Sequence, residues 1–346
     1  MSTFKATIEV IDTVSPHSNA DRLDILTVKG MNFRFVSAKG RFKQGDAVVY
    51  IPLDSIVPQE VLAKMGLVGK LTGKDRNRVK TIVLRGEISQ GLVDSPENLG
   101  VKGNIGDDVT DILGIVKYEP PMKPCKNANL LPLPAGLTTY DIEGCDRFSH
   151  ILETLYENPV FITEKAEGSN FSVTVDAAGH IWVNQRNYTI QEKDGVTHDF
   201  WAEARKKVIP FAQKLLIDKK VRSVTIYGEF IGFGYNGNIY KMNNHKILVF
   251  DILLSDSHKT YMNSDEFISV CKANDIETVP VLAYNVLLKD WLNGKTIKDA
   301  SHGKSLIGDT LREGIVVKPM VESRHSEIGR LFLKQRDPIY LTGADC

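Results

Sequence analysis

The stretch FITEKAEGSN, residues 161–170, begins as a strand-like run and then presents Lys165 to a polar turn that contains a glycine. A lysine amine is a weak nucleophile, because at an ordinary pKa near 10.4 only about 1 in 10³ is neutral at pH 7. A neighbouring cation, such as Lys334 or a bound metal ion, would lower that pKa and favour attack by the amine. The stretch therefore predicts covalent chemistry at Lys165, and the plain alternative is a surface lysine.

Further segments downstream, most of them β-rich, carry charged or aromatic residues in a fixed order. They are NQRN (184–187), IYGEFIG (226–232), LVFDIL (248–253), REGIVVKP (312–319) and LFLKQR (331–336). Strands bring such ends to one sheet edge, where a ligand can bind. The set offers no Ser/His/Asp or Cys/His arrangement, and the chain has no P-loop or Rossmann glycine motif.

This inventory fits transfer of a nucleotide to a lysine. Attack on an α-phosphate needs positive charge near the phosphate oxygens, which Lys318, Lys334 and a divalent cation would supply. Carboxylates at Glu229 and Glu313 would hold the waters of that cation, or a ribose hydroxyl. Phe250 offers a face for stacking a base, although aromatic residues on strands also serve as ordinary core.

In order and content, the six segments resemble the motifs of the covalent nucleotidyltransferase superfamily, which contains ATP-dependent DNA and RNA ligases and mRNA capping enzymes. The resemblance covers residues 161–336. It implies that Lys165 becomes linked to AMP by a phosphoamide bond, with ATP and Mg²⁺ or Mn²⁺ as cofactors. The resemblance also implies that Glu164 recognises adenine, Arg186 contacts the nucleotide, Glu229 binds the ribose and Phe250 stacks on the purine. It implies that Glu313, with Glu229 as a second candidate, organises the metal ion through its waters, and that Lys318 and Lys334 contact the α-phosphate. Glu167 and Asn170 would serve later steps of the reaction.

Two positions depart from the superfamily pattern. Glu167 stands where DNA ligases usually have aspartate before the glycine, and Arg336 stands where a second lysine is usual in the final motif. Arginine keeps the charge and grips phosphate by two bonds, but it does not titrate. We therefore include Arg336 among the nucleotide-binding residues.

The segments in front of these motifs predict a separate domain. Residues 5–94 consist of short β-rich runs punctuated by glycines, which is typical of a small barrel. SPHSNADRLDILTVKG (15–30) and the segment after it resemble the OB-fold tRNA-binding domains attached to some synthetases. We therefore predict an OB-fold-like nucleic-acid-binding domain over residues 1–117.

A proline-rich segment, 118–137, follows the barrel and is predicted to be a linker, because 118–136 holds five of the fourteen prolines. Residues 138–346 are predicted to form the nucleotidyltransferase domain, of mixed character. Apolar residues at helical spacing predict a helix over 198–218, which Pro210 must kink or restart. The predicted fold class is α+β, a barrel followed by antiparallel sheets with flanking helices.

The segment 70–85 is strongly basic, with six Lys or Arg residues and one Asp. Such a run suits a phosphate backbone, and its alternative reading is a solvated loop. The residues predicted to contact RNA are Lys70, Lys74, Arg76, Arg78 and Lys80.

The order of the domains narrows the choice among the branches of this superfamily. DNA ligases and capping enzymes carry an OB domain after the catalytic domain, whereas here the OB-like segment comes first and the sequence ends ten residues after Arg336. This order resembles the Deinococcus-type RNA ligase family over nearly the whole chain. The resemblance implies sealing of 3′-OH and 5′-phosphate ends at nicks in duplexes whose 3′-OH strand is RNA, so the expected partner is RNA or an RNA-containing nicked duplex.

Three alternatives stay open at this point: an ATP-dependent ligase that prefers DNA ends, a capping-type guanylyltransferase, and a non-catalytic RNA-binding protein whose second domain is degenerate. The sequence has 42% hydrophobic residues, a formal net charge of +0 and no run of the roughly 18 apolar residues that span a bilayer. Its start lacks a signal-peptide apolar region. We therefore expect a cytoplasmic protein with free cysteines, no membrane partner and no obligate protein partner.

Overall fold

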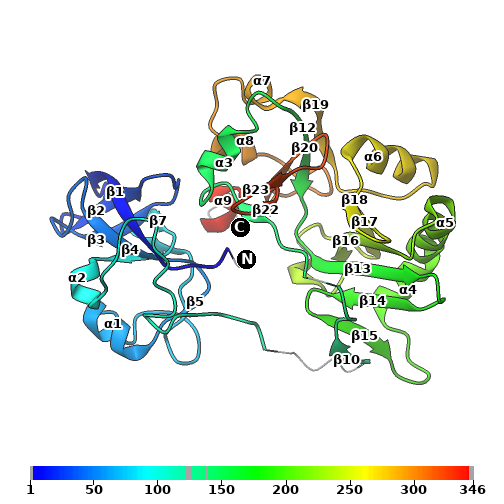
Figure 1. Cartoon of the computed structure of the whole chain (residues 1–346), viewed down its shortest axis with the longest axis horizontal. Coiled ribbons are helices and arrows are strands. Elements are labelled where there is room, and N and C mark those ends of the chain that lie inside the picture. The colour runs from blue at the N-terminus through cyan, green and yellow to red at the C-terminus, as the bar shows by residue number, and fades with distance from the viewer. Residues whose placement is uncertain (1–2, 122–126, 138, 343–346) are drawn as a thin grey trace. The chain divides into compact units, whose positions relative to one another are not determined.

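The computed structural model describes residues 3–121, 127–137 and 139–342. Contacts divide the chain into two compact units, Met1–Pro121 with Cys145–Ile151, and Met122–Gly144 with Leu152–Cys346 (Figure 1). Cys145 and Cys271 are buried free thiols, while Cys125 and Cys346 lie outside the described residues. Within the described part of the chain, no helix is long and apolar enough to cross a membrane.

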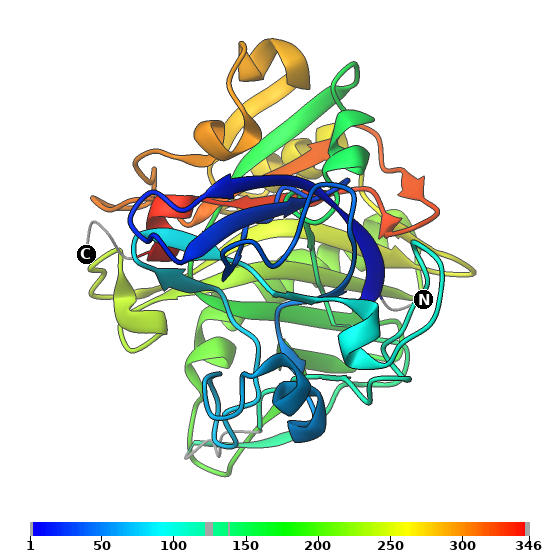
Figure 2. The same ribbon diagram turned by 90° about the vertical axis from the view of Figure 1, so that its left-hand side faces the viewer.

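The first unit is built on a five-stranded antiparallel sheet in the order β3-β2-β1-β4-β8. Its strands are β1 (Thr7–Pro16), β2 (Leu23–Val28), β3 (Phe35–Ala38), β4 (Ala47–Ile51) and β8 (Leu92–Asp94). The first half of β1 pairs with β4 and the second half with β2, with a register shift at Ile11, so the strand bends strongly (Figure 2). This bend lets one strand serve both sides of a curved sheet.

Strand β4 shows why the first unit has a core on each side of its sheet. Val48 and Tyr50 pack into one hydrophobic cluster, whereas Val49 and Ile51 pack into another. Alternate residues of a strand point to opposite faces, so a continuous apolar run is buried on both. Helices α1 (Gln59–Met65) and α2 (Pro96–Leu99) contribute to the second cluster. The short pairs β5 (Ser55–Ile56) with β9 (Val116–Lys117), and β6 (Ile82–Leu84) with β7 (Glu87–Ser89), complete the unit.

The second unit contains two larger sheets. The seven-stranded sheet has the order β10-β15-β14-β13-β16-β17-β18, and the five-stranded sheet has the order β11-β23-β20-β12-β19. The strands of the first are β10 (Ala128–Pro132), β13 (Ser169–Asp176), β14 (Ile181–Gln185), β15 (Tyr188–Glu192), β16 (Ser223–Gly232), β17 (His245–Ser255) and β18 (Lys259–Tyr261). Those of the second are β11 (Glu143–Gly144), β12 (Pro159–Lys165), β19 (Val281–Leu287), β20 (Gly314–Pro319) and β23 (Leu333–Arg336). Between the strands of these two sheets only β11 and β23 pair in parallel, so the predicted antiparallel α+β character is confirmed.

The main core of this unit lies on one face of the seven-stranded sheet. Phe171 and Val173 of β13 pack there against Phe200 and Phe211, while Ser172 and Thr174 point to the other face. Those two phenylalanines come from α4 (Asp199–Glu203) and α5 (Ile209–Lys219), which lie along that face (Figure 1). The remaining helices are α3 (Ser149–Glu153), α6 (Ser264–Ala273), α7 (Leu288–Leu292), α8 (Ile297–Ser301) and α9 (Pro338–Thr342), and a β21 (Arg324–His325) to β22 (Gly329–Arg330) hairpin precedes β23. The polar face of the sheet is left for a ligand.

Pro210 is accommodated without breaking its helix. Between α4 and α5 the backbone forms a π-helical turn over Ala204–Val208, and the Ile209 amide donates to the carbonyl of Ala204. A proline removes one amide donor and crowds the preceding turn, and a π turn is one way to absorb such a defect. The predicted helix therefore runs on through a π turn, and no interruption separates α4 from α5.

Two segments near the predicted domain boundaries take part in the fold. Residues Ala128–Pro132, within the predicted linker 118–137, form β10, which pairs with β15 at the edge of the large sheet. Segment Cys145–Ile151 belongs with the first unit, where the Ser149 hydroxyl donates to the carbonyl of Gly30. Both contacts join residues far apart in sequence, so no local pattern signals them. The boundaries 1–117 and 138–346 remain a prediction.

Candidate active site

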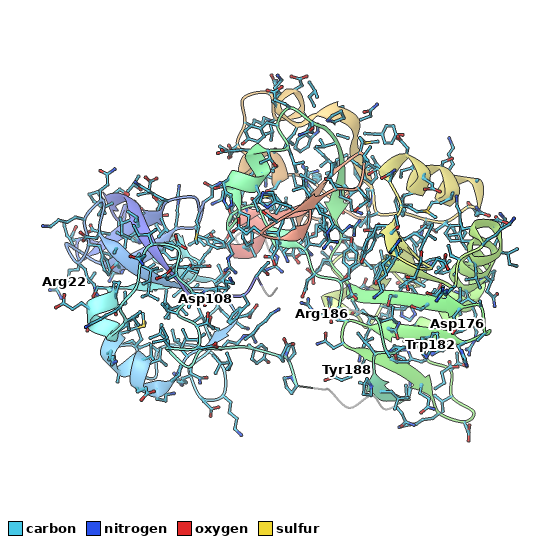
Figure 3. All side chains as sticks on the ribbon, viewed as in Figure 1. Arg22, Asp108, Asp176, Trp182, Arg186 and Tyr188 are labelled. Atoms are coloured by element: carbon cyan, nitrogen blue, oxygen red, sulfur yellow. The ribbon has the colours of Figure 1, made fainter. Side chains whose placement is uncertain are left out.

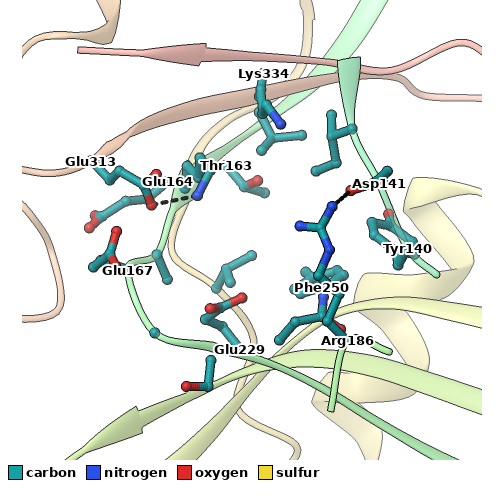
Figure 4. Close-up of a pocket in the computed structure, with 18 of the residues that line it drawn as sticks. Tyr140, Asp141, Thr163, Glu164, Glu167, Arg186, Glu229, Phe250, Glu313 and Lys334 are labelled. Carbon is teal, nitrogen blue, oxygen red and sulfur yellow. Dashed lines mark hydrogen bonds and ion pairs between the residues drawn. The ribbon is translucent and has the colours of Figure 1, made fainter. Parts of the chain in front are cut away.

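The second unit contains a pocket of about 440 Å³ above the polar face of its large sheet (Figure 4). Its walls include residues of β12, β13, β14, β16, β17, β20 and β23. All the residues predicted to bind the nucleotide line it, namely Glu164, Lys165, Glu167, Asn170, Arg186, Glu229, Phe250, Glu313, Lys318, Lys334 and Arg336. The fold therefore brings the six sequence segments to one place, as their strand-end positions predicted.

Lys165 is the last residue of β12, which lies between β19 and β20 in the five-stranded sheet. Its partner in the ladder is Gly314, directly after Glu313, and the Lys165 ammonium donates to the Glu313 carboxylate. The lysine side chain is 20% exposed and that of Glu313 is 5% exposed. A central strand thus presents an amine at the pocket wall.

The glycine of that stretch allows two strands to approach closely. A Cβ atom at Gly168 would lie 2.5 Å from the carbonyl oxygen of Phe230 and 2.7 Å from Ile231 Cγ2. Contacts this short are incompatible with any side chain. Glycine at this position therefore lets β13 begin against β16 immediately after the lysine.

Two cations border Glu313, and a third lines the same pocket. Lys165 contacts it directly, the Arg336 Nε lies 3.3 Å from its carboxylate, and Lys334 lines the same pocket. Burial acts to raise the pKa of Glu313, but Lys165 and Arg336 outweigh it and the pKa is lowered. Burial, Arg336 and Lys165 lower the pKa of Lys334 to about 8. The predicted crowding of cations is present in the fold.

Two further carboxylates face these groups. Burial, with repulsion from Glu313, raises the pKa of Glu167 to about 7. Burial, with repulsion from Glu313 and Glu167, raises the pKa of Glu229 to about 8 although Lys165 acts against it. The Tyr340 hydroxyl of α9 hydrogen-bonds Glu167. Three carboxylates, Glu167, Glu229 and Glu313, therefore repel one another in this part of the pocket, and a divalent cation would relieve that repulsion.

We expect Glu229→Gln to change how stability depends on pH. The folded-state pKa of Glu229, about 8, lies above its ordinary value of 4.5, so the stability that this group contributes is complete below pH 4.5 and is lost as pH rises through 8. Between pH 7 and 9 the wild-type chain should lose about 1.4 kcal/mol that the glutamine variant retains. Urea unfolding at both pH values measures the difference, and Glu153→Gln, at an exposed glutamate of the same unit, is the control. Parallel pH profiles for wild type and Glu229→Gln would contradict the assignment.

Phe250 lies at the other end of the pocket, beside a buried ionic network. Its ring is 5.0 Å from that of Tyr140, and the next residue, Asp251, is only 1% exposed. Asp251 accepts from Lys318 at 3.0 Å and from Arg330 at 2.6 Å, and the Tyr140 hydroxyl also donates to it. Burial acts to raise the pKa of Asp251, but the two cations outweigh it and the pKa is lowered.

This network gives Lys318 hydrogen-bond partners within the protein that the sequence did not predict. Its ammonium is bonded to Asp251 and to the carbonyl oxygen of Phe250 at 3.0 Å, and burial lowers its pKa. It lies on β20, a central strand of the five-stranded sheet. Contact with a phosphate would require Lys318 to share or leave these partners.

Glu164 is also engaged within the protein. Its carboxylate accepts from the Ser305 hydroxyl at 2.5 Å and from the Leu306 amide at 2.8 Å. Burial raises its pKa, and these two hydrogen bonds act against that shift. The carboxylate thus ties β12 to segment 305–306, and adenine recognition by Glu164 remains a prediction.

Arg186 follows β14 at the pocket end of that strand, away from Trp182 at the other end (Figure 3). Its guanidinium pairs with Asp141, and both side chains stay largely exposed, at 52% and 42%. The pair lies on the pocket wall opposite Glu313 (Figure 4). Asp141 and Tyr140 were not identified from the sequence, because they lie beside the proline-rich segment and carry no motif.

The sequence of the second unit matches the model of a known protein family. A family model described as RNA ligase matches residues 158–335, just over half of the chain. The chain belongs to the RNA ligase family. A second model, an OB-fold domain, matches residues 5–96, so the predicted OB-fold of the first unit is confirmed. No protein of curated function matches the sequence.

Solved structures support this family assignment over the full length. A Naegleria gruberi RNA ligase in an apo mutant form is 26% identical, with 99% of each chain covered and a TM-score of 0.81. The same ligase with PPi is 27% identical, with 99% of each chain covered and a TM-score of 0.79. A mutant of it with ATP and Mn is 26% identical, with 98% of each chain covered and a TM-score of 0.79. This RNA ligase therefore shares its whole architecture, OB-fold included, with the Naegleria protein.

The basic run of the first unit is only partly available to a ligand. Lys70, Lys74, Arg76 and Lys80 are exposed. Arg78 instead pairs with Asp54 at 2.5 Å and stacks on Tyr118 at 3.5 Å, so the structure gives it an internal role. RNA contact by the exposed members of the run remains a prediction.

Proposed function

We propose that this RNA ligase uses ATP to join 3′-OH and 5′-phosphate ends at nicks in duplexes whose 3′-OH strand is RNA. The observation that carries the proposal is Lys165 at a strand end, in one pocket with Glu313, Lys334 and Arg336. The OB-fold ahead of the catalytic unit favours the Deinococcus-type branch. ATP as the nucleotide is supported by the Naegleria ligase, which was solved with ATP and Mn.

In the first step, the Lys165 Nζ attacks the α-phosphorus of ATP. A P–N bond forms, the bond to the bridging oxygen breaks, and pyrophosphate leaves. The amine is held by Glu313 before the reaction, so attack requires that contact to loosen and the ammonium to lose a proton. Lys334 and Arg336 add positive charge in the same pocket, which stabilises the phosphate oxygens.

The carboxylates of the pocket fit a divalent cation held through its waters. Among the described residues, no group of three or more His, Cys, Asp or Glu side chains has the arrangement of a direct metal site. Glu167, Glu229 and Glu313 nevertheless line one pocket. The pKa values of Glu167 and Glu229 are raised, and the pKa of Glu313 is lowered by the cations beside it. Such a group of carboxylates suits outer-sphere binding of Mg²⁺ or Mn²⁺. The ion would supply positive charge at the α-phosphate. Its charge would also compete with Lys165 for Glu313.

Two further transfers complete the reaction. An oxygen of the 5′-phosphate attacks the α-phosphorus of lysyl-AMP, the P–N bond breaks and Lys165 recovers its amine. The 3′-OH then attacks the adenylylated 5′-phosphate, a phosphodiester bond forms and AMP leaves with the bridging oxygen. Phe250 at one pocket end and Arg186 beside it are the candidates for holding the purine and its phosphate.

Label transfer tests the proposal. The protein is incubated with Mg²⁺ and α-labelled ATP or GTP, denatured and examined for bound label, and then given nicked duplexes with an RNA or a DNA 3′-OH strand. We expect label from ATP alone and sealing of the RNA 3′-OH strand. If protein shown by its mass to be free of AMP takes up no label, the proposal of ATP-dependent ligation is overturned. If duplexes with a DNA 3′-OH strand are sealed as well as those with an RNA 3′-OH strand, the proposed strand preference is overturned.

The exposed part of the basic run gives a separate expectation. Lys74→Glu with Arg76→Glu should weaken binding of a nicked duplex and reduce its salt slope by about two, because each lost phosphate contact removes about one. Titrations at several salt concentrations measure both. Lys39→Glu with Lys43→Glu, at exposed lysines of the same unit, makes the same charge change elsewhere. Equal losses of duplex affinity in the two double variants would show that binding depends on the net charge of the unit and not on the basic run.

A further inference from the structure

The loop between β16 and β17, residues 233–244, is anchored to the catalytic stretch. The Asn236 side-chain amide donates to the carbonyl of Gly168 and, at 3.2 Å, to the Glu167 carboxylate. The Glu167 amide donates to the Tyr240 hydroxyl at 2.8 Å. Asn236 also lines the pocket. The loop is therefore part of the pocket rim next to Lys165.

Its backbone is held in a defined shape. Asn236, Asn238 and Lys241 adopt left-handed conformations, with φ of 41°, 46° and 52°, which residues other than glycine rarely adopt. The Asn238 side chain closes the loop through both the amide and the carbonyl of Met242. The imidazole of His245 donates to the Phe233 carbonyl at 2.8 Å. The side chains on this loop are thus presented from a fixed support.

The outward surface of the loop has an unusual composition. Phe233 is 69% exposed, and it is the single phenylalanine among the exposed large hydrophobic residues of the described chain. Residues 233–244 contain no Asp or Glu, while Lys241, Asn243 and Asn244 are exposed. An aromatic face with amides, a cation and no acidic group is the surface that single nucleic-acid strands bind by stacking and phosphate contact.

We propose that Phe233 stacks on a nucleobase of the polynucleotide end that is brought to the active site, with Lys241 near its backbone. The inference rests on the proposed function, since a 5′-phosphate can reach AMP on Lys165 only by crossing the pocket rim. The loop borders Glu167 and Gly168 directly, so a strand entering there passes Phe233. The ring then contributes to binding of the strand and leaves transfer of AMP to Lys165 unaffected.

The test compares Phe233→Ala, Phe233→Leu and Phe233→Trp in binding of a fluorescent nicked duplex and in label transfer from ATP. We expect alanine to raise the Kd about tenfold, leucine to restore little, and tryptophan to match wild type, with label transfer within twofold in all three. Ile217→Ala is the control, because Ile217 is 74% exposed on α5, outside the residues that line the pocket. Thermal unfolding establishes that each variant is folded.

The outcomes separate the two proposals. An alanine variant that binds the duplex within twofold of wild type overturns the stacking site, as does a leucine variant equal to tryptophan. If Phe233→Ala does not fold, the comparison of Phe233→Leu with Phe233→Trp decides whether the duplex needs an aromatic ring or only an apolar side chain at this position. Failure of wild-type protein to take label from ATP overturns the ligase proposal instead, and the binding comparison still decides the role of Phe233.

Discussion

Alanine in place of Lys165 is expected to abolish covalent attachment of AMP, with label incorporation from ATP reduced about 10³-fold or more. The reason is local: the Lys165 Nζ is the amine that the fold presents beside Glu313, with Arg336 near the same carboxylate and Lys334 in the same pocket. Arginine at position 165 should fail as well, since it keeps the ion pair with Glu313 but has no neutral form at working pH. The measurement is bound label after denaturation.

A preformed adenylylated strand sharpens this test. The last step needs no lysine nucleophile, so Lys165→Ala should still seal a nicked duplex whose 5′-phosphate already carries AMP. Lys304→Ala is the matched control, because Lys304 is 83% exposed and paired only with an exposed Asp309. Full label on Lys165→Ala would show that the nucleophile lies elsewhere. Loss of sealing on the adenylylated strand would assign Lys165 a role beyond covalent transfer.

Replacing Asp251 with asparagine is expected to destabilise the second unit by about 3–5 kcal/mol, the usual effect of removing one partner from a buried ion pair. Asp251 is the shared acceptor of Lys318 and Arg330, which are 8% and 11% exposed at their side chains. Without the carboxylate, the buried Lys318 loses its ion pair, and Arg330 is left with Glu322 as its partner. Urea unfolding of the two proteins at pH 7 measures the difference.

Two comparisons test the electrostatic cause. Asp256→Asn removes an exposed carboxylate that pairs with Arg222 at 3.2 Å, and the expected loss is about 0–1 kcal/mol. Lys318→Met added to Asp251→Asn should recover part of the stability, because one unpaired buried cation is removed. A loss below about 1 kcal/mol for Asp251→Asn alone would contradict the view that this network holds the pocket together.

Much of the catalytic unit could be predicted from local pattern. The runs before Lys165, through Glu229, through Phe250 and after Glu313 are strands in the fold, because β-branched and apolar residues at a two-residue period are best buried in a sheet. Strand ends gather at a sheet edge, so the order of the motifs was sufficient to predict one pocket. In the first unit the short β-rich runs predicted a small barrel, the resemblance to tRNA-binding domains implied an OB-fold, and the family model confirms it.

The partners of the site residues could not be predicted in the same way. Lys318 lines the pocket and is bonded to Asp251, 67 positions earlier in the chain, and the Glu164 carboxylate is bound by Ser305 and Leu306. Strand β10 inside the supposed linker is a similar case, since it exists only through its pairing with β15. None of these contacts leaves a local periodic signal.

The sequence by itself predicted which residues line the pocket, because a nucleophile, its phosphate-binding cations and its carboxylates must be particular residue types on or beside β-strands. The tertiary structure alone decided how these groups are held before reaction: Lys165 on Glu313, Lys318 on Asp251, and the rim loop on Gly168. Each of these contacts depends on the distance between atoms from different strands and loops. Such distances are set by sheet register and packing, which no single stretch of sequence contains.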